Sequence, residues 1–156
     1  MSSSELIEKA IWEAAGKPSD ELSPEDLGEL RELHLSDIEI TDLSPLEGLT
    51  GLRGLQHSNK QLTAVTPLAE LTALKKLYLG FNHITDVTPL GTMTDLRELS
   101  LWNNQITDLS PLTGLKRLDR LNIRENLITD LWPLVNFKQL TRVELSSNYV
   151  HCLVPL

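Results

Sequence analysis

The stretch LRELSLWNNQITDLSPLTGLKR, Leu96 to Arg117, reads L-x-x-L-x-L-x-x-N-x-I-x-D-L-x-P-L-x-x-L-x-x over 22 residues. The same pattern precedes it as LKKLYLGFNHITDVTPLGTMTD, Leu74 to Asp95, and follows it as LDRLNIRENLITDLWPLVNFKQ, Leu118 to Gln139. A fixed period of this length indicates a solenoid of stacked repeats, in which each turn of the chain packs on the next. Looser copies begin at Leu30, Leu52 and Leu140.

Seven apolar positions recur in the three closest copies, and their spacing predicts which side chains face the core. The first, fourth and sixth positions surround a short strand, in which neighbouring side chains point to opposite faces. The eleventh, fourteenth, seventeenth and twentieth positions complete the lining. One repeat alone cannot hide seven apolar side chains, so neighbours must stack into a continuous core. In the central copy the seven are Leu96, Leu99, Leu101, Ile106, Leu109, Leu112 and Leu115.

The asparagine at position nine and the proline at position sixteen predict how the chain turns within each repeat. An inward asparagine at position nine offers both a carbonyl and an amide to backbone groups that need partners. We expect the copies to form a structural ladder, so that Asn104→Ala destabilises more than Asn103→Ala. Proline at position sixteen of all six copies favours a tight extended or 3₁₀ segment over a full α-helix. The ladder residues are Asn82, Asn104, Asn126 and Asn148, and the prolines are Pro45, Pro67, Pro89, Pro111, Pro133 and Pro155.

These motifs resemble the short leucine-rich repeats of bacterial internalins. They are also similar to the repeats of the leucine-rich regulatory subunit of protein phosphatase 1. The resemblance covers residues 30–156. It implies an α/β fold: a right-handed solenoid with a parallel sheet on its concave face and a short 3₁₀ or extended convex side. It also implies a binding role, without naming the partner; a regulatory role toward a phosphatase rests on fold analogy alone.

The chain before the repeats predicts an N-terminal helical cap over residues 1–29. Ser2 and Glu5 fit a capping box at the start of an amphipathic helix over residues 2–16. A second short helix is expected over residues 23–30. Such a cap covers the apolar end face of the first repeat. Six repeats follow in the same structural domain: 30–51, 52–73, 74–95, 96–117, 118–139 and the incomplete 140–156.

The net charge of −8 is concentrated in the expected cap. Residues 1–29 hold eight acids and two lysines, whereas residues 30–156 hold fourteen acids and twelve bases. An acidic chain of this kind is a poor candidate for binding nucleic acid or an anionic membrane. The sequence also contains no apolar run of membrane-spanning length.

The N-terminus and the cysteine content bear on the compartment. The opening residues MSSSELIEKA lack the apolar centre of a signal peptide. The single cysteine, Cys152, excludes an internal disulfide and suits a reducing compartment. We therefore expect a cytoplasmic protein, or an extracellular one if a signal peptide has been removed.

Positions two, three, five, seven and eight of each repeat surround the core leucines and are left free by the apolar pattern. We expect their side chains to point outward and to form a partner-binding concave face. The candidate contact residues are His34, Gln56, Lys76, Tyr78, Phe81, Glu98, Trp102, Arg120, Asn122, Arg124 and Glu144.

Three aromatic residues at these free positions, Tyr78, Phe81 and Trp102, fall in adjacent repeats. Exposed aromatic residues flanked by bases are typical of interface centres. The alternative is that Phe81 folds over the edge of the sheet and Trp102 lies on its neighbours. Trp132, just before Pro133, is expected to pack on the convex side, with a second contact surface as its alternative.

Acids and bases interleave on the last three strands. Their arrangement predicts a solvated face on which the charges pair with one another, and the alternative is an acidic partner segment docked on the arginines. The bases are Arg120, Arg124 and Arg142, and the acids are Glu98, Glu125 and Glu144.

The sequence contains no phosphate loop, nucleophile elbow or His-Glu zinc motif. The four histidines occupy different repeat positions and are not expected to converge on a metal. Aspartate at position thirteen favours turn hydrogen bonding over a calcium or catalytic role. His57 replaces a core leucine, and we expect it to be buried with a hydrogen bond. The position-thirteen aspartates are Asp42, Asp86, Asp108 and Asp130.

The sequence therefore predicts a non-enzymatic protein-binding module with no cofactor and no metal. One alternative is a fragment of a longer internalin-like surface adhesin. Another is a carbohydrate-binding module that stacks sugars on its concave aromatic residues. The last repeat lacks a polar capping segment, which predicts a homodimer, a partner that covers this end, or a longer chain.

Overall fold

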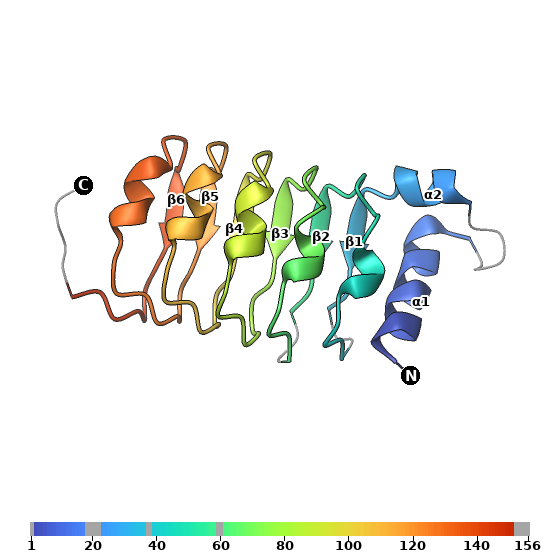
Figure 1. The fold of residues 1–156 in the computed structure, drawn as a ribbon, viewed down its shortest axis with the longest axis horizontal. Coiled ribbons are helices and arrows are strands. Elements are labelled where there is room, and N and C mark those ends of the chain that lie inside the picture. Colours follow the sequence, from blue (N-terminus) through green and yellow to red (C-terminus); the bar gives the residue numbers. More distant parts are fainter. Residues whose placement is uncertain (1, 18–22, 37–38, 59–60, 152–156) are drawn as a thin grey trace.

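The computed structural model describes residues 2–17, 23–36, 39–58 and 61–151. Two helices stand at one end of a row of coils, and each coil contributes one short strand (Figure 1). The strands form one parallel sheet in chain order. They are β1 (Glu32–His34), β2 (Gly54–Gln56), β3 (Lys76–Tyr78), β4 (Glu98–Ser100), β5 (Arg120–Asn122) and β6 (Arg142–Glu144).

The register of the sheet follows the repeat period. Residues 22 positions apart lie side by side, as Leu77 pairs with Leu99 and Leu99 with Leu121. These fourth-position side chains point into the core together with the other apolar positions of the repeat. The fold is therefore a leucine-rich repeat solenoid, as the sequence predicts.

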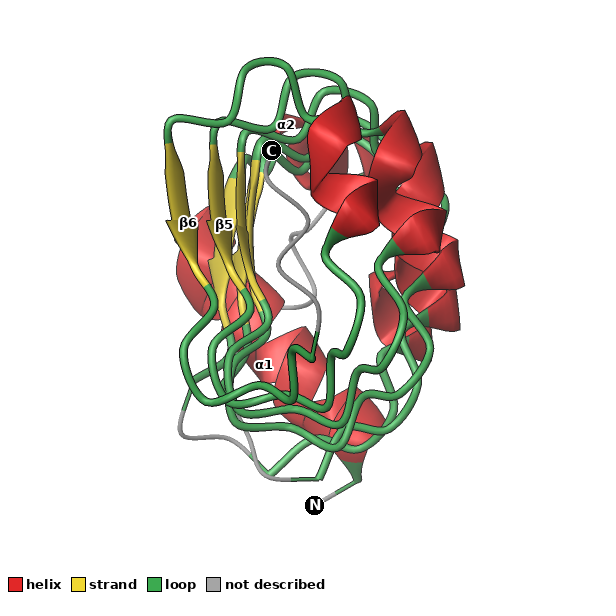
Figure 2. Ribbon diagram, turned by 90° about the vertical axis from the view of Figure 1, so that its left-hand side faces the viewer, coloured by secondary structure: helices red, strands yellow, loops and turns green. Residues whose placement is uncertain are grey.

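Short 3₁₀ helices lie opposite the sheet, with the core between the two layers (Figure 2). Each has the repeat proline in its first turn, where the missing N–H is not needed. The aspartate at position thirteen accepts the backbone N–H of the residue two further on, for example Asp108 from Ser110 at 2.8 Å. This confirms the predicted turn role of these aspartates. The helices are Ser44–Leu46, Thr66–Leu68, Thr88–Thr92, Ser110–Gly114 and Trp132–Asn136.

The N-terminal cap consists of α1 (Ser3–Ala15) and α2 (Pro24–Glu29). The backbone N–H of Ser2 donates to Glu5 at 2.7 Å, which completes the predicted capping box. The apolar stripe of α1 packs on β1 and on the first 3₁₀ helix, with Ile7 at its centre. The cap therefore covers the first repeat and fixes where the sheet begins.

Asparagines at position nine bridge consecutive coils. Asn104 Nδ2 donates to the carbonyls of Leu101 in its own repeat, at 2.9 Å, and of Leu79 in the previous one, at 3.0 Å. Its Oδ1 accepts the backbone N–H of Ile84 at 3.0 Å. Asn82, Asn126 and Asn148 make the equivalent bonds in their own repeats.

His57 lies in the second repeat, which has no asparagine at position nine. It is fully buried, and its Nδ1 lies 3.3 Å from the carbonyl of Leu35. This carbonyl is the one that a position-nine asparagine would bind in the second repeat. That position is Lys60, which lies outside the described residues, as do Ile38 at position nine of the first repeat and residues 152–156. His57 thus meets the backbone requirement that the ladder meets elsewhere.

Candidate functional site

The outer surface of the sheet is formed by the third and fifth positions of the repeats, because the fourth and sixth positions point into the core. We call this surface the concave face. All the third- and fifth-position candidates lie on its strands: His34, Gln56, Lys76, Tyr78, Glu98, Arg120, Asn122 and Glu144.

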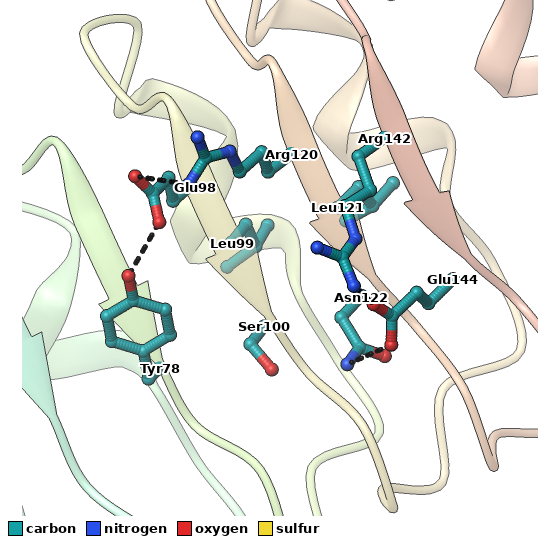
Figure 3. Close-up of a pocket in the computed structure, with 9 residues that line it drawn as sticks. All are labelled: Tyr78, Glu98, Leu99, Ser100, Arg120, Leu121, Asn122, Arg142 and Glu144. Atoms are coloured by element: carbon teal, nitrogen blue, oxygen red, sulfur yellow. Dashed lines mark hydrogen bonds and ion pairs between the residues drawn. The ribbon is translucent and has the colours of Figure 1, made fainter.

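Glu98 on β4 joins the side chains of three strands. Its Oε2 accepts the Tyr78 hydroxyl at 2.7 Å, and its Oε1 lies 3.4 Å from Nη1 of Arg120 (Figure 3). Lys76 Nζ lies 3.9 Å from the same Oε1. The Glu98 side chain is 21% exposed, whereas the Lys76 and Arg120 side chains are 51% and 61% exposed, so the two ion pairs face solvent on their basic side. The carboxylate therefore fixes the Tyr78 hydroxyl and pairs with two exposed bases across β3, β4 and β5.

The environment of Tyr78 keeps its hydroxyl protonated. Burial is the largest cause, followed by the hydrogen bond to Glu98, and together they raise the pKa of Tyr78 to about 12. A neutral phenol that donates to a carboxylate is the stable form throughout the physiological pH range. The ring is half-buried and presents an ordered, amphipathic surface.

A second group lies on β5 and β6. Asn122 Nδ2 donates to Glu144 Oε2 at 3.1 Å, and Arg142 Nη2 pairs with Glu144 Oε1 at 2.7 Å (Figure 3). Between this group and the Glu98 group, the surface is hollowed by about 280 Å³. We call this hollow the concave depression. It is lined by Tyr78, Glu98, Leu99, Ser100, Arg120, Leu121, Asn122, Arg142 and Glu144.

Trp102 lies against the end of β3 rather than standing free. Its ring meets Phe81 edge to face, with 4.1 Å between centroids. A Cβ added to Gly80 would collide with Nε1 and Cδ1 of the indole. The indole of Trp102 can therefore pack against the backbone of Gly80 only because Gly80 has no side chain. The backbone of Phe81 is left-handed, with φ +56°. Residues at the same position of the next three repeats also have positive φ, between +53° and +59°: Asn103, Glu125 and Ser147.

The remaining candidates lie around these groups. His34 Nδ1 lies 3.3 Å from Gln56 Oε1 on the first two strands. Arg124 Nη2 pairs with Glu125 Oε1 at 2.8 Å, beyond the end of β5. The predicted self-pairing of charges is therefore present for Arg120, Arg124 and Arg142.

Two residues differ from the sequence interpretation. Trp132 was expected to pack on the convex side, but it is 62% exposed, because it precedes Pro133 in a turn whose inward side is filled by Leu134. Arg142 lines the concave depression although it was not among the candidate contacts. Its place at position three, the position of Glu98 and Arg120, is the signal that identifies it.

Within the described ranges, no three His, Cys, Asp or Glu side chains gather as a metal site would need. The helices among the described residues are all too short or too polar to cross a lipid bilayer.

A solenoid with a structured concave face defines the class of leucine-rich repeat scaffolds, a fold typical of protein-interaction modules. A family model described as leucine-rich repeats, two copies, matches residues 94–136. The structure of internalin C2 from Listeria monocytogenes is 31% identical, with a TM-score of 0.65, over 97% of this chain and 87% of that one. The chain therefore belongs to the internalin-like family of bacterial leucine-rich repeat proteins.

Two further solved structures extend the comparison. Internalin F from Listeria monocytogenes is 31% identical, with a TM-score of 0.89, and the match covers 95% of this chain but 44% of that one. The ectodomain of the Arabidopsis thaliana receptor kinase GASSHO1/SCHENGEN3, solved in complex with CASPARIAN STRIP INTEGRITY FACTOR 2, is 25% identical, with a TM-score of 0.70, over 85% of this chain and 18% of that one. A search of curated proteins gives no match.

Proposed function

We propose that this chain is a non-enzymatic protein-binding module whose partner contacts the concave face from β3 to β5. The observation that carries the proposal is the Tyr78–Glu98–Arg120 group beside the concave depression. Tyrosine and arginine are enriched among residues that dominate binding energy. Here the hydrogen bond to Glu98 fixes Tyr78 before a partner arrives, which lowers the entropy cost of binding.

The aromatic pair extends this surface along the strand ends. Phe81 and Trp102 are half-buried and fixed against each other and against Gly80. A rigid aromatic group gives a partner apolar area at small conformational cost. The plant receptor ectodomain solved in complex with CASPARIAN STRIP INTEGRITY FACTOR 2 has a similar fold, and it supports a protein partner in general terms.

A pull-down from a lysate of the source bacterium or its host tests the proposal. The bait proteins are the wild type and the variant Tyr78→Ala/Phe81→Ala/Trp102→Ala. The control is Trp132→Ala, which removes an exposed tryptophan on the opposite side of the solenoid. Thermal unfolding followed by circular dichroism establishes that all three proteins are folded.

We expect a protein that the wild type and Trp132→Ala retain and that the triple variant loses. Retention by all three would place the site elsewhere and contradict the proposal. Glycan-array binding that depends on Tyr78 and Trp102, without a protein ligand, would favour the carbohydrate alternative.

A role within a longer surface adhesin is the second candidate. The similarity to internalin F, of whose length this chain covers 44%, favours it. Binding of the chain to intact host cells, lost in the triple variant, would support that role. Binding to purified soluble proteins of the bacterium alone would count against it.

A second copy of the chain is a further candidate partner, at the C-terminal end. Val143 occupies a core position of the repeat yet is 38% exposed, whereas Leu121 at the same position is 1% exposed. Stacking two such ends would bury this apolar surface. Analytical ultracentrifugation should show a dimer that Val143→Glu dissociates, and a wild-type monomer at high concentration would contradict the idea.

A further inference from the structure

A row of bases precedes the strands at position two of the repeats. Arg53, Lys75 and Arg97 come directly before β2, β3 and β4, and all three are exposed. We call these three residues the basic row. Their backbones are hydrogen-bonded in sequence, since Lys75 N–H donates to the Arg53 carbonyl at 2.8 Å and Arg97 N–H to the Lys75 carbonyl at 2.9 Å. The bases therefore lie on adjacent coils, about 4.8 Å apart at the backbone.

The backbone hydrogen bonds at position two differ from those within the strands. The Arg53 carbonyl accepts two N–H groups, from Lys75 at 2.8 Å and from Lys76 at 3.0 Å, and the Lys75 carbonyl likewise accepts Arg97 and Glu98. These residues precede the regular ladder of the strands, and all three bases at position two are exposed. The basic row thus adjoins the third-position residues of the concave face.

The charges of the basic row are not neutralised by acidic side chains in the described part of the chain. None of the three side chains forms an ion pair with a described carboxylate, although Lys76, Arg117, Arg120, Arg124 and Arg142 all do. Like charges on neighbouring strands destabilise a sheet. The repeat does not require a base there, because position two is Asp119 and Thr141 in the following coils.

We propose that the basic row binds an acidic segment of the protein partner, laid across the strand starts beside the concave depression. This inference deepens the proposed function and rests on it. Three strands span about 10 Å, which three to four residues of extended peptide cover. Arginine and lysine would pair with its carboxylates, while the adjacent depression takes a neighbouring side chain.

The surroundings favour a short acidic peptide over a long polyanion. Arg31, the next base in line, donates through Nη1 to the carbonyls of Gly28, at 2.6 Å, and Gly51, at 3.2 Å, and so is engaged with the cap. Beyond it stand the acids of α2, and at the other end lies Asp119. A nucleic acid or sulfated glycan would run into acidic surface at both ends of the row, on a chain of net charge −8.

The test uses a displayed library of random twelve-residue peptides, selected on the immobilised full chain. Peptides enriched on the wild type are then synthesised and measured by fluorescence anisotropy. The variant Arg53→Gln/Lys75→Gln/Arg97→Gln removes the basic row. The matched control, Lys9→Gln/Lys116→Gln/Lys138→Gln, makes the same change in net charge at exposed lysines elsewhere.

We expect enriched peptides to carry two or more Asp or Glu residues within four positions. Their affinity should fall at least about tenfold on the basic-row variant, stay within about twofold on the control, and weaken as NaCl is raised. The salt dependence is measured on the wild type, so it tests the proposal even if the basic-row variant is poorly folded. In that case the single variant Lys75→Gln is used in place of the basic-row variant.

Enriched peptides without an acidic bias, or equal binding to the basic-row variant, would overturn this inference. If those peptides still lose affinity on Tyr78→Ala/Phe81→Ala/Trp102→Ala, the proposed function stands without it. A different result is that acidic peptides lose affinity for the basic-row variant and keep it for Tyr78→Ala/Phe81→Ala/Trp102→Ala. That result would support binding by the basic row and contradict the proposed function of the concave face. Binding to heparin or DNA in place of any peptide would also overturn the inference.

Discussion

The side chain of Asn104 accepts a hydrogen bond from the backbone N–H of Ile84, twenty residues earlier in the chain, at 3.0 Å. Together with the bonds from its amide to two carbonyls, this makes one residue the link between two coils. The same link occurs at Asn82 and Asn126, which are buried, and at Asn148, which is partly buried, so the stability of the solenoid depends on a column of amides.

We predict that Asn104→Ala lowers the free energy of unfolding by about 2–3 kcal/mol, because it leaves several buried backbone groups without partners. Asn103→Ala is a poor control, since Asn103 has φ +53°, a region where alanine is strained. Asn103→Gly fits that backbone and should change stability by less than about 1 kcal/mol. Urea denaturation measures both, and equal losses would contradict the ladder.

His57 predicts a pH dependence of stability. Burial is the main cause that lowers the pKa of His57, and the backbones of Leu35 and Ile40 act in the opposite direction. Its Nε2 has no well-formed hydrogen bond among the described residues. The folded state therefore keeps the ring neutral at a pH where the unfolded chain already binds a proton.

The stability supplied by neutral His57 is complete above pH 6.5, the ordinary pKa of histidine, and is lost as the pH falls below it. Between pH 7 and pH 5.5 we expect a loss of up to about 1 kcal/mol. The variant His57→Leu should be less dependent on pH over this range, whatever its absolute stability. Urea titrations at several pH values measure this, and equal slopes for the two proteins would contradict the assignment.

Gly80 is predicted to control the position of Trp102. In Gly80→Ala the new methyl group would occupy the place of the indole and displace it from Phe81. With Trp12 and Trp132 replaced by phenylalanine, fluorescence reports on Trp102 alone, and its emission should shift to the red as the ring becomes more exposed. Gly28→Ala, where an added Cβ meets nothing within 4 Å, is the matched control. An unchanged spectrum in Gly80→Ala would show that the indole does not rest there.

The period of the repeat was sufficient to predict the sheet. Each strand lies where the first, fourth and sixth positions place it, and the proline at position sixteen correctly predicts the 3₁₀ helices. Periodicity succeeds here because each coil contacts only its neighbours, so a local pattern determines the packing.

Contacts between particular side chains were beyond the reach of the same reasoning. The repeat pattern puts Tyr78 and Glu98 on one face, but their 2.7 Å hydrogen bond depends on rotamers across two strands. The left-handed backbone at position eight could not be inferred either, because Phe81 and Glu125 are not the residues that usually adopt it. The exposure of Trp132 could not be inferred for a related reason: Leu134, two residues further on, fills the inward side of the turn.

The most direct test of the central claim is the affinity of the purified partner, once a pull-down has provided it, for single variants on the two sides of the solenoid. Isothermal titration calorimetry should show that Tyr78→Ala and Trp102→Ala each weaken binding by about thirtyfold, as expected of interface hot spots. Trp132→Ala should stay within about twofold of the wild type. A large loss for Trp132→Ala, with Tyr78→Ala and Trp102→Ala unchanged, would place the partner on the convex side and contradict the account.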